Sequence, residues 1–438
     1  MRDFQKPERS EVFSSNGMIA TSHPLAAKIG LDAMSKGGNA IDAAISAALM
    51  LVLCEPQSTG LFGDAFAIIK SEKSEGIIGL NGSGSAPMAL SSDILLSKNM
   101  REVPLNSAHA VTVPGAISLF EEVADKFGNL GLKELCTQPI KYAEEGIVVS
   151  PRVSFDWFTH RKKLVGSSEK FYLNAGEPYK AGSIFKAPMQ AEVLRQIAAL
   201  GSKGFYQSDI TIDLVKSLKE LGGVHTLADF ENVKVQYVDP IHVNLKDGST
   251  LIELPPNGQG VTAIMMKKLM EFCNIERFSA DSFERVHLEA EIAKIAYSAR
   301  NHFIGDPNIS EIKQNIFLEE SYLAKLSTEI SLGKLLNDDI EEDFFNRNKD
   351  TVLICAADNS GNAISLIFST FHAFGSGLCS EKYGLLFHNR GAGFILKKNH
   401  PNELLGGKRP LHTIIPAILK EKNGSIMPFG VMGCLLYT

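Results

Sequence analysis

Two apolar segments flanking position 360 constrain the fold more than any other part of this 438-residue chain. Residues 352–357 and 363–370 are rich in apolar and β-branched side chains, which favour strands. The residues between them, 358–362, read Asp-Asn-Ser-Gly-Asn. These residue types tolerate positive φ and hydrogen bond to their own backbone. The pattern therefore predicts a buried β-hairpin that turns at 358–362.

Thr351 stands at the start of the first predicted strand, where two interpretations are open. As an ordinary strand residue it needs no further role, because threonine is common in strands. Alternatively, the chain is cut between Asp350 and Thr351. The freed α-amino group, with an unperturbed pKa of about 8, would then act as the base for the threonine hydroxyl. One residue would supply both nucleophile and base, so no histidine or aspartate partner is required.

Helix-end signals and hydrophobic periodicity predict the other elements. Asn39 precedes the apolar stretch 40–53 and has the side chain of an N-cap. A helical apolar period predicts one helix over 132–146. The remaining predicted segments are helices at 25–35 and 283–303, a strand at 384–388, and an exposed connector at 337–350.

A set of motifs resembles a known family. Asp-Thr-Val at 350–352 and Asp-Asn-Ser-Gly-Asn-Ala-Ile-Ser at 358–365 are followed by Phe-Gly-Ser-Gly at 374–377 and Gly-Gly-Lys-Arg-Pro-Leu at 406–411. In this combination the chain resembles the γ-glutamyltransferase family, whose members are proenzymes of the N-terminal-nucleophile hydrolase class. Within it, the chain is most similar to the divergent glutathione-hydrolase-like branch. The resemblance runs from about Gly17 to the last residues.

The resemblance implies an α+β fold, the four-layer αββα sandwich of two face-to-face, mainly antiparallel sheets with helices outside. Residues 1–350 would form the large segment and 351–438 the small segment. The two segments would stay associated after cleavage between Asp350 and Thr351, and association into a homodimer is left open. Relatives continue past the point where this chain stops, so we expect a C-terminally truncated chain with an incomplete small segment.

The resemblance also implies the catalytic groups. Thr351 is the expected nucleophile, and Ser369 matches a family threonine whose hydroxyl orients it. A strand serine bonded to backbone is the alternative for Ser369. The backbone N–H groups of Gly433 and Cys434 match the turn that holds the oxyanion, and backbone donors do not depend on the side chain. Cys434 replaces the usual glycine, so its Cβ is expected to crowd the pocket.

Two departures from the family pattern concern the substrate. Ser83 stands where relatives carry an arginine that grips the substrate's α-carboxylate, and a serine cannot reproduce the two charge-assisted bonds of a guanidinium. Gly393 stands where relatives carry a carboxylate for the substrate's amino group. Both departures leave the reaction type intact but favour a smaller or differently charged acyl donor.

Four other residues lie at or beside matching binding positions. Arg390 adds a positive charge that we expect to bind a substrate carboxylate from a different side, and Asn389 precedes it. His412 and Thr413 replace a serine pair that contacts the substrate in relatives. A structural role is the alternative for His412.

Together these features predict a self-processing amidohydrolase or acyltransferase that works through an acyl-enzyme. γ-Glutamyl compounds such as glutathione are the expected donors by resemblance. An oxamate-like or dicarboxylate acyl amide is the alternative donor. An inactive, truncated relative is the alternative from another class.

The composition bears on which partners the protein binds and on the cellular compartment in which it works. The net charge is −6 and Lys and Arg are not clustered with aromatics, so we predict no nucleic-acid or membrane partner. The six cysteines are scattered without a Cys-x-x-Cys pair, as for thiols in a reducing compartment. The charged N-terminus has no apolar core, so we expect no signal peptide and a cytoplasmic protein.

A histidine and a glutamate on one predicted helix raise the question of a metal site. His287 and Glu291 are four residues apart on the predicted helix 283–303 and so share a face. A zinc site needs further ligands, and the chain has no His-Glu-x-x-His motif. We therefore interpret them as an exposed i,i+4 pair and predict neither a metal nor a cofactor.

Overall fold

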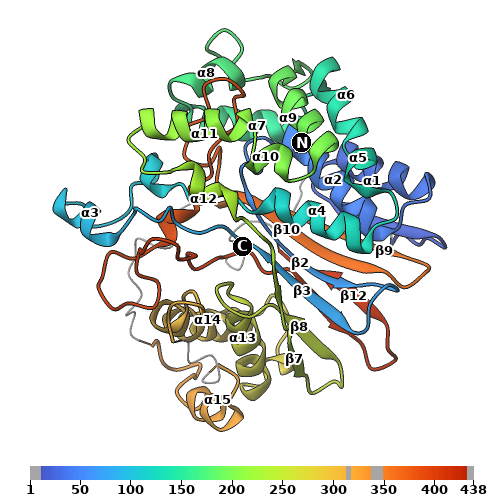
Figure 1. Ribbon diagram of the computed structural model, residues 1–438. Coiled ribbons are helices and arrows are strands. Elements are labelled where there is room, and N and C mark those ends of the chain that lie inside the picture. Colours follow the sequence, from blue (N-terminus) through green and yellow to red (C-terminus); the bar gives the residue numbers. More distant parts are fainter. Residues whose placement is uncertain (1–10, 312–316, 337–348, 432–438) are drawn as a thin grey trace.

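The computed structural model describes residues 11–311, 317–336 and 349–431. It contains two antiparallel sheets, one with strand order β1-β9-β10-β2-β3-β6 and one with order β12-β11-β8-β7 (Figure 1). The first sheet consists of β1 (Gly17–Thr21), β2 (Asp64–Lys70), β3 (Ile77–Gly82), β6 (Gln236–Val238), β9 (Lys349–Asp358) and β10 (Ala363–His372). The second consists of β7 (Ile241–Asn244), β8 (Thr250–Glu253), β11 (Ala417–Lys420) and β12 (Ile426–Phe429). A separate pair is formed by β4 (Ile147–Val148) and β5 (Ile184–Phe185).

The predicted hairpin is present as β9 and β10, in the middle of the larger sheet. Its turn is held by Asp358, whose Oδ1 accepts hydrogen bonds from the N–H groups of Ser360 and Asn362. Gly361 takes a φ of 84°, which glycine adopts without strain. The first strand begins at Lys349, earlier than predicted. The 350–351 bond therefore lies within a strand, while residues 337–348 of the predicted connector lie outside the described residues.

The layers follow the order expected for an αββα sandwich. Above the larger sheet lie α1 (Pro24–Ser35), α2 (Ala40–Cys54) and α4 (Ala116–Phe127); on the outer side of the smaller one lie α13 (Gly260–Phe272), α14 (Phe283–Phe303) and α15 (Glu320–Ser327) (Figure 1). Between the sheets, apolar side chains such as Phe66, Ile252, Ile367 and Ile418 form one buried cluster. The predicted fold class is confirmed.

The central helix α2 shows why this sequence folds locally as it does. Asn39 caps it by accepting hydrogen bonds from the N–H groups of Ile41 and Asp42, and Asp42 accepts the N–H of Asn39 in return. Every residue of α2 is buried, because its Ala- and Leu-rich sequence packs against the sheet on one side and helices on the others. The hairpin turn joins this helix end, since Asp358 accepts the Ala40 N–H at 2.8 Å.

Two sequence predictions of secondary structure were wrong. The single helix at 132–146 is two helices, α5 (Gly131–Leu135) and α6 (Thr137–Glu145). Pro139 lies near this break and has no N–H for the carbonyl of Leu135. The predicted strand at 384–388 is a loop with one isolated bridge, Cys379 to Leu386.

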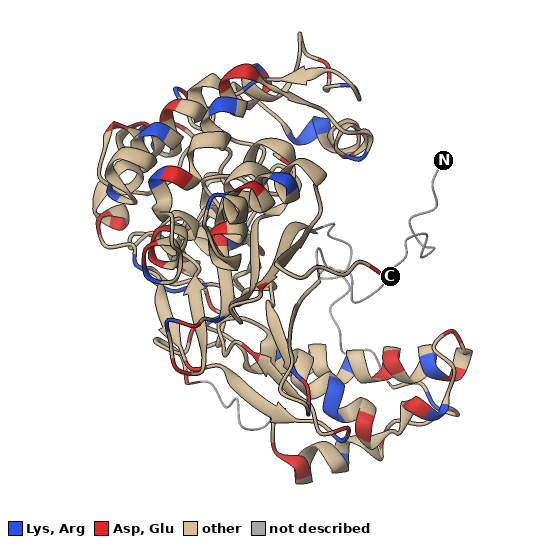
Figure 2. Cartoon of the chain, turned by 90° about the vertical axis from the view of Figure 1, so that its right-hand side faces the viewer, with Lys and Arg blue, Asp and Glu red and all other residues tan. Residues whose placement is uncertain are grey.

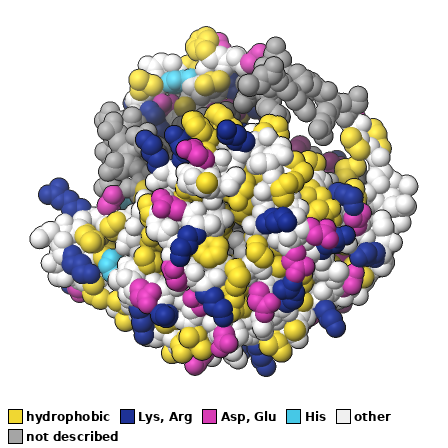
Figure 3. Space-filling model, turned by 90° about the horizontal axis from the view of Figure 1, so that it is seen from above, with side chains coloured by type: hydrophobic (Ala, Val, Ile, Leu, Met, Phe, Trp, Pro, Cys, Tyr) yellow, Lys and Arg dark blue, Asp and Glu magenta, His cyan; other side chains and the backbone are white. Residues whose placement is uncertain are grey.

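Further α-helices connect these elements along the described chain. They are α3 (Ser92–Ser97), α7 (Pro151–His160), α8 (Ser167–Tyr172), α9 (Pro188–Leu200), α10 (Lys203–Tyr206), α11 (Asp209–Glu220) and α12 (Leu227–Glu231). The solvent faces of the helices carry both signs of charge (Figure 2), with i,i+4 pairs such as Lys28–Asp32 on α1 and Arg285–Glu289 on α14. The face seen from above likewise mixes Lys and Arg with Asp and Glu (Figure 3). Among the described helices, none combines the length and the apolar character needed to cross a bilayer.

Candidate active site

The hydroxyl groups of Thr351 and Ser369 meet at one end of the space between the two sheets. Side chains alternate along a strand, so Thr351 shares a face with Leu353, and Ser369 shares a face with Ile367. Both of these neighbours belong to the apolar cluster between the sheets. Thr351 Oγ1 lies 3.2 Å from Ser369 Oγ, and Thr351 is half-buried. The structure thus brings the two predicted catalytic hydroxyls into contact.

A β-bulge shapes the strand opposite the 350–351 bond. The pairing of β10 with β9 shifts register between Phe368 and Phe371. Phe371 pairs with Asp350 and has a φ of +81°, in a region that non-glycine residues rarely adopt. Its N–H donates to Ser369 Oγ at 2.7 Å. The bulge therefore turns the Ser369 hydroxyl toward Thr351, as bulges beside functional sites often re-aim a side chain.

Asp64, at the start of β2, is the centre of a buried charged network. It is fully buried and pairs directly with Ser369 in the sheet register. Its Oδ1 accepts hydrogen bonds from the N–H groups of Gly84 at 3.0 Å and Gly115 at 3.2 Å. Its Oδ2 lies 3.4 Å from His412 Nε2 and 3.7 Å from His388 Nδ1. Sequence reasoning missed Asp64 and His388; the one available signal was an acidic residue at the head of an apolar strand.

The network keeps its charges on Asp64 and Arg390. Burial alone raises the pKa of Asp64, but His388, His412 and Arg390 outweigh it and hold that pKa below its usual value. Burial, together with the Arg390 charge, lowers the pKa of His412 to about 3. Burial likewise lowers the pKa of His388. Both histidines are therefore neutral at physiological pH and act as hydrogen-bonding groups.

Arg390 begins the short 3-10 turn η6 (Arg390–Gly393) and is only 1% exposed. Its Nη1 donates to Thr413 Oγ1 at 3.0 Å. Its guanidinium carbon lies 3.9 Å from the centre of the Phe371 ring, a cation–π distance. Burial lowers the pKa of Arg390 to about 9 while Asp64 opposes the shift, so the side chain stays charged at neutral pH. Arg390 and Thr413, both predicted to contact substrate, are thus in direct contact with each other.

The other predicted contact residues are used within the protein. Asn389 accepts hydrogen bonds from the His372 N–H and ring through Oδ1, and its Nδ2 donates to the Leu105 carbonyl at 3.2 Å. These contacts hold the loop that carries Arg390. His412 Nε2 donates to Asp64, whereas its Nδ1 has no hydrogen-bond partner within the described chain.

Gly433 and Cys434, the predicted oxyanion residues, lie outside the described residues. The segment leading to them returns to the hairpin. Ser365 Oγ donates to the Phe429 carbonyl at 2.7 Å. A Cβ on Gly430 would stand 3.0 Å from Leu353 and 3.1 Å from Ile367. The described chain therefore ends beside the strands that carry Thr351 and Ser369.

The side chain of Ser83 is hydrogen bonded to two side-chain amides. Ser83 Oγ donates to Asn81 Oδ1 at 2.7 Å and accepts from Asn257 Nδ2 at 3.2 Å. Arg409 Nε donates to the Ser83 carbonyl at 2.9 Å, so another segment supplies a guanidinium next to this site. At Gly393, the carbonyl accepts a hydrogen bond from Asn402 at 2.6 Å.

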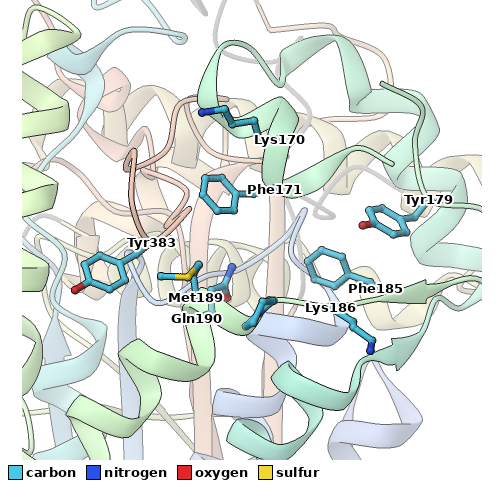
Figure 4. Close-up of a pocket in the computed structure, with 10 residues that line it drawn as sticks. Lys170, Phe171, Tyr179, Phe185, Lys186, Met189, Gln190 and Tyr383 are labelled. Carbon is cyan, nitrogen blue, oxygen red and sulfur yellow. The ribbon is translucent and has the colours of Figure 1, made fainter. Parts of the chain in front are cut away.

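A cavity of about 220 Å³ lies away from these groups, between α8, β5, the start of α9 and the loop that carries Tyr383. In the view of Figure 4, Phe171 and Met189 lie between Tyr383 and Phe185. Gln190 also lines the cavity. No lining residue belongs to the Thr351–Ser369 pair or to the Asp64 network. We therefore place the candidate active site at the β9–β10 hydroxyl pair.

The structure contradicts the predicted exposed pair on α14. His287 Nε2 lies 3.0 Å from the Ser331 carbonyl, whereas Glu291 is buried and accepts the Leu336 N–H at 2.7 Å. Each of the two side chains is thus bonded to the chain at 331–336, which covers this face of the helix. Within the described residues, no group of three His, Cys, Asp or Glu side chains could hold a metal ion.

Comparison with known proteins covers nearly the whole chain. The family model described as Gamma-glutamyltranspeptidase matches residues 26–436. A "Glutathione hydrolase proenzyme" of Bacillus subtilis is 27% identical over 95% of this chain and 75% of its own length. An "Oxamate amidohydrolase proenzyme" of Klebsiella pneumoniae is 31% identical over 96% of this chain and 79% of its own length.

Solved structures show the same likeness. A cephalosporin acylase from Bacillus halodurans superimposes with a TM-score of 0.89 at 32% identity, covering 99% of this chain and 80% of that one. A γ-glutamyltranspeptidase from Helicobacter pylori has a TM-score of 0.70 at 26% identity, covering 78% of this chain and 98% of that one.

Proposed function

The chain belongs to the γ-glutamyltranspeptidase family, an enzyme family of hydrolases and transferases, and from this premise we propose that it is a self-processing amidohydrolase or acyltransferase with Thr351 as its nucleophile. One observation carries the proposal. Thr351 is the residue that follows the bond to be cut, and its hydroxyl lies 3.2 Å from the Ser369 hydroxyl. Proenzyme names among the relatives support a processing step.

Processing begins with attack of Thr351 Oγ1 on the carbonyl carbon of Asp350. The C–N bond between the two residues breaks as the C–O bond forms, and the amide becomes an ester. Water then hydrolyses the ester, which leaves a carboxylate on Asp350 and a free α-amino group on Thr351. Ser369 Oγ, fixed by the Phe371 N–H, holds the attacking hydroxyl in position.

Turnover uses the new amino group as the base. It takes the proton of Oγ1 as this oxygen attacks the amide carbon of the substrate, and it returns the proton to the leaving amine. The acyl group stays on Thr351 until water or an acceptor amine removes it. The N–H groups of Gly433 and Cys434 are proposed to stabilise the oxyanion of both tetrahedral intermediates.

Two classes of acyl donor are proposed. γ-Glutamyl compounds such as glutathione are favoured by the names of several relatives. An oxamate-like or dicarboxylate acyl amide is the alternative, because the Ser83 side chain is already bound to Asn81 and Asn257. The name of the Klebsiella relative supports this second class.

The segments 1–350 and 351–438 are proposed to remain associated after the cut. Strand β10, and β9 from Thr351 onward, belong to the second segment and lie between β1 and β2 from the first, so each boundary is a ladder of backbone hydrogen bonds. A cytoplasmic location is also proposed. In its support, the five cysteines at described positions are free thiols.

Intact-mass measurement tests the processing step. We expect purified protein to give two fragments divided between Asp350 and Thr351. Thr351→Ala should stay one chain, whereas Thr351→Ser keeps the hydroxyl and should be cut. Circular dichroism of the Ala variant controls for folding. A wild-type chain that stays whole, together with amidase activity in Thr351→Ala, would overturn the proposal.

A further inference from the structure

We propose that the Nε–Nη2 edge of Arg390 binds a carboxylate on the acyl group of the substrate, and that Asp64 is a positioning residue for this guanidinium. The inference rests on the proposed function and adds the residue that selects the acyl donor. It rests on two buried N–H donors, Nε and Nη2 of Arg390, that have no hydrogen-bond partner within the described residues.

The unused donors form one edge of the guanidinium. Nη1 is bonded to Thr413, whereas neither Nε nor Nη2 has a hydrogen-bond partner within the described residues. The N–H groups of Nε and Nη2 point the same way and match the two oxygens of a carboxylate side-on. Buried charged donors without partners carry a large free-energy penalty, which a bound anion would remove.

The edge is held rigidly. The flat face of the guanidinium stacks on Phe371, and Thr413 fixes the opposite edge. Thr413 is itself held, because its carbonyl accepts a hydrogen bond from Gln259 Nε2 at 2.7 Å. A guanidinium restrained in this way loses little side-chain entropy when it binds an anion, so binding is favoured.

Phe371 connects Arg390 to the proposed nucleophile. Phe371 supports the guanidinium with its ring and holds Ser369 Oγ with its N–H. Ser369 Oγ in turn contacts Thr351 Oγ1. An acyl group with its carboxylate on Arg390 would thus extend toward the nucleophile across two neighbouring residues.

Asp64 balances the buried charge but leaves the edge of Arg390 open. Its Oδ1 accepts two backbone N–H groups, and its Oδ2 faces His412 and His388. Asp64 therefore contributes attraction at a distance while its own oxygens are bonded elsewhere. The Nε–Nη2 edge of Arg390 therefore stays available to a ligand. The attraction of Asp64 keeps the guanidinium charged and oriented.

The chemistry selects a monoamide of a dicarboxylic acid as donor. Glutaryl and γ-glutamyl amides carry the same terminal carboxylate, but only the second carries an α-ammonium. Gly393 provides no side chain for that ammonium. Pentanoyl amides have the chain length of glutaryl amides without the carboxylate. We therefore compare the glutaryl, γ-glutamyl and pentanoyl p-nitroanilides as donors. Glutaryl against pentanoyl tests recognition of the carboxylate, and glutaryl against γ-glutamyl tests recognition of the ammonium.

We expect processed wild-type enzyme to prefer glutaryl over pentanoyl p-nitroanilide by at least about 100-fold in kcat/KM, because a site built for hydrogen bonding rejects an analogue that lacks the bonds. Glutaryl and γ-glutamyl donors should be turned over within about tenfold of each other. Arg390→Gln should reduce the glutaryl preference to near unity. Arg390→Lys keeps the charge beside Asp64, loses the fork, and should give an intermediate preference. Arg152→Gln, at an exposed arginine paired with Asp156, is the control.

Binding of free glutarate gives a readout without turnover. Glutarate should raise the thermal midpoint of the wild type and of Arg152→Gln, but not that of Arg390→Gln or Arg390→Lys. Asp64→Asn should raise KM for the glutaryl donor more than for the pentanoyl donor. If no donor is hydrolysed but glutarate still stabilises through Arg390, the proposed function fails and this inference stands. Equal use of glutaryl and pentanoyl donors by the wild type, with no glutarate effect, would show that only water occupies the edge.

Discussion

Asp64, the first residue of β2, and Ser369 of β10 are direct cross-strand partners. Residues opposite each other in an antiparallel pair place their side chains on the same face of the sheet. The carboxylate that organises the buried network and the hydroxyl that contacts Thr351 therefore lie on the same face, in adjacent strands. Substitutions on either strand should separate the effects of charge from those of hydroxyl positioning.

Ser369→Ala tests hydroxyl positioning. It removes the partner of Thr351 Oγ1 and leaves the nucleophile in place, so both chain cleavage and amide hydrolysis should slow by on the order of 100-fold. Cleavage is followed by the disappearance of the full-length band, and hydrolysis with an anilide donor. Ser154→Ala on α7 is the matched control, since Ser154 donates to the Tyr179 carbonyl away from the site. Equal rates in both variants would show that Ser369 is only structural.

Asp64→Asn tests the buried charge. It removes the carboxylate that attracts the buried Arg390 charge from a distance, and a buried charge left without its counter-charge lowers the free energy of unfolding by roughly 3 kcal/mol. Urea unfolding in a Thr351→Ala background keeps one intact chain in every sample. Asp93→Asn removes an exposed partner of Lys398 and should change stability by less than about 1 kcal/mol. Similar values for the two substitutions would contradict the network.

Acid sensitivity should come partly from His412. Its pKa is about 3 in the folded state, against an ordinary value near 6.5. Between those values the unfolded chain binds a proton that the folded protein does not, so the free energy of unfolding falls as pH falls from about 6.5 toward 3. The lowered pKa of Asp64 adds a loss only below about 3.8.

His412→Gln should therefore flatten the dependence of the urea midpoint between pH 7 and 5, again in the Thr351→Ala background. The matched control is His242→Gln, at an exposed position on β7. A slope that the two variants share with the parent would mean that other groups cause the acid sensitivity.

Asn39→Ala tests the local capping of α2. It removes the acceptor of the Ile41 and Asp42 N–H groups and the donor to the Phe127 carbonyl. We expect a loss of about 1–2 kcal/mol in the free energy of unfolding. Ser91→Ala is the comparison, because Ser91 precedes α3 without a side-chain capping bond. A loss as large in Ser91→Ala would show that the capping bonds are not responsible.

The sequence was informative wherever neighbouring residues decide the conformation. The cap at Asn39, the hairpin turn at Asp358 and the helix α14 all depend on groups within a few positions of one another. The family motifs added the positions of Thr351 and Ser369, and the hairpin explains why residues 18 positions apart come into contact. The predicted strand at 384–388 failed because the partners of that segment are loop residues, which no local pattern indicates.

The sequence by itself determined the hairpin, the helix ends and the likeness to a family, since turn chemistry, capping and periodicity act over short distances. Only the tertiary structure decided which polar side chains are buried together. Asp64 and His412 are 348 positions apart, and their contact exists because β2 and the loop after Lys408 meet between the sheets. The open edge of Arg390 follows from that packing, because burial removes water from a charged group and leaves its free donors to a ligand.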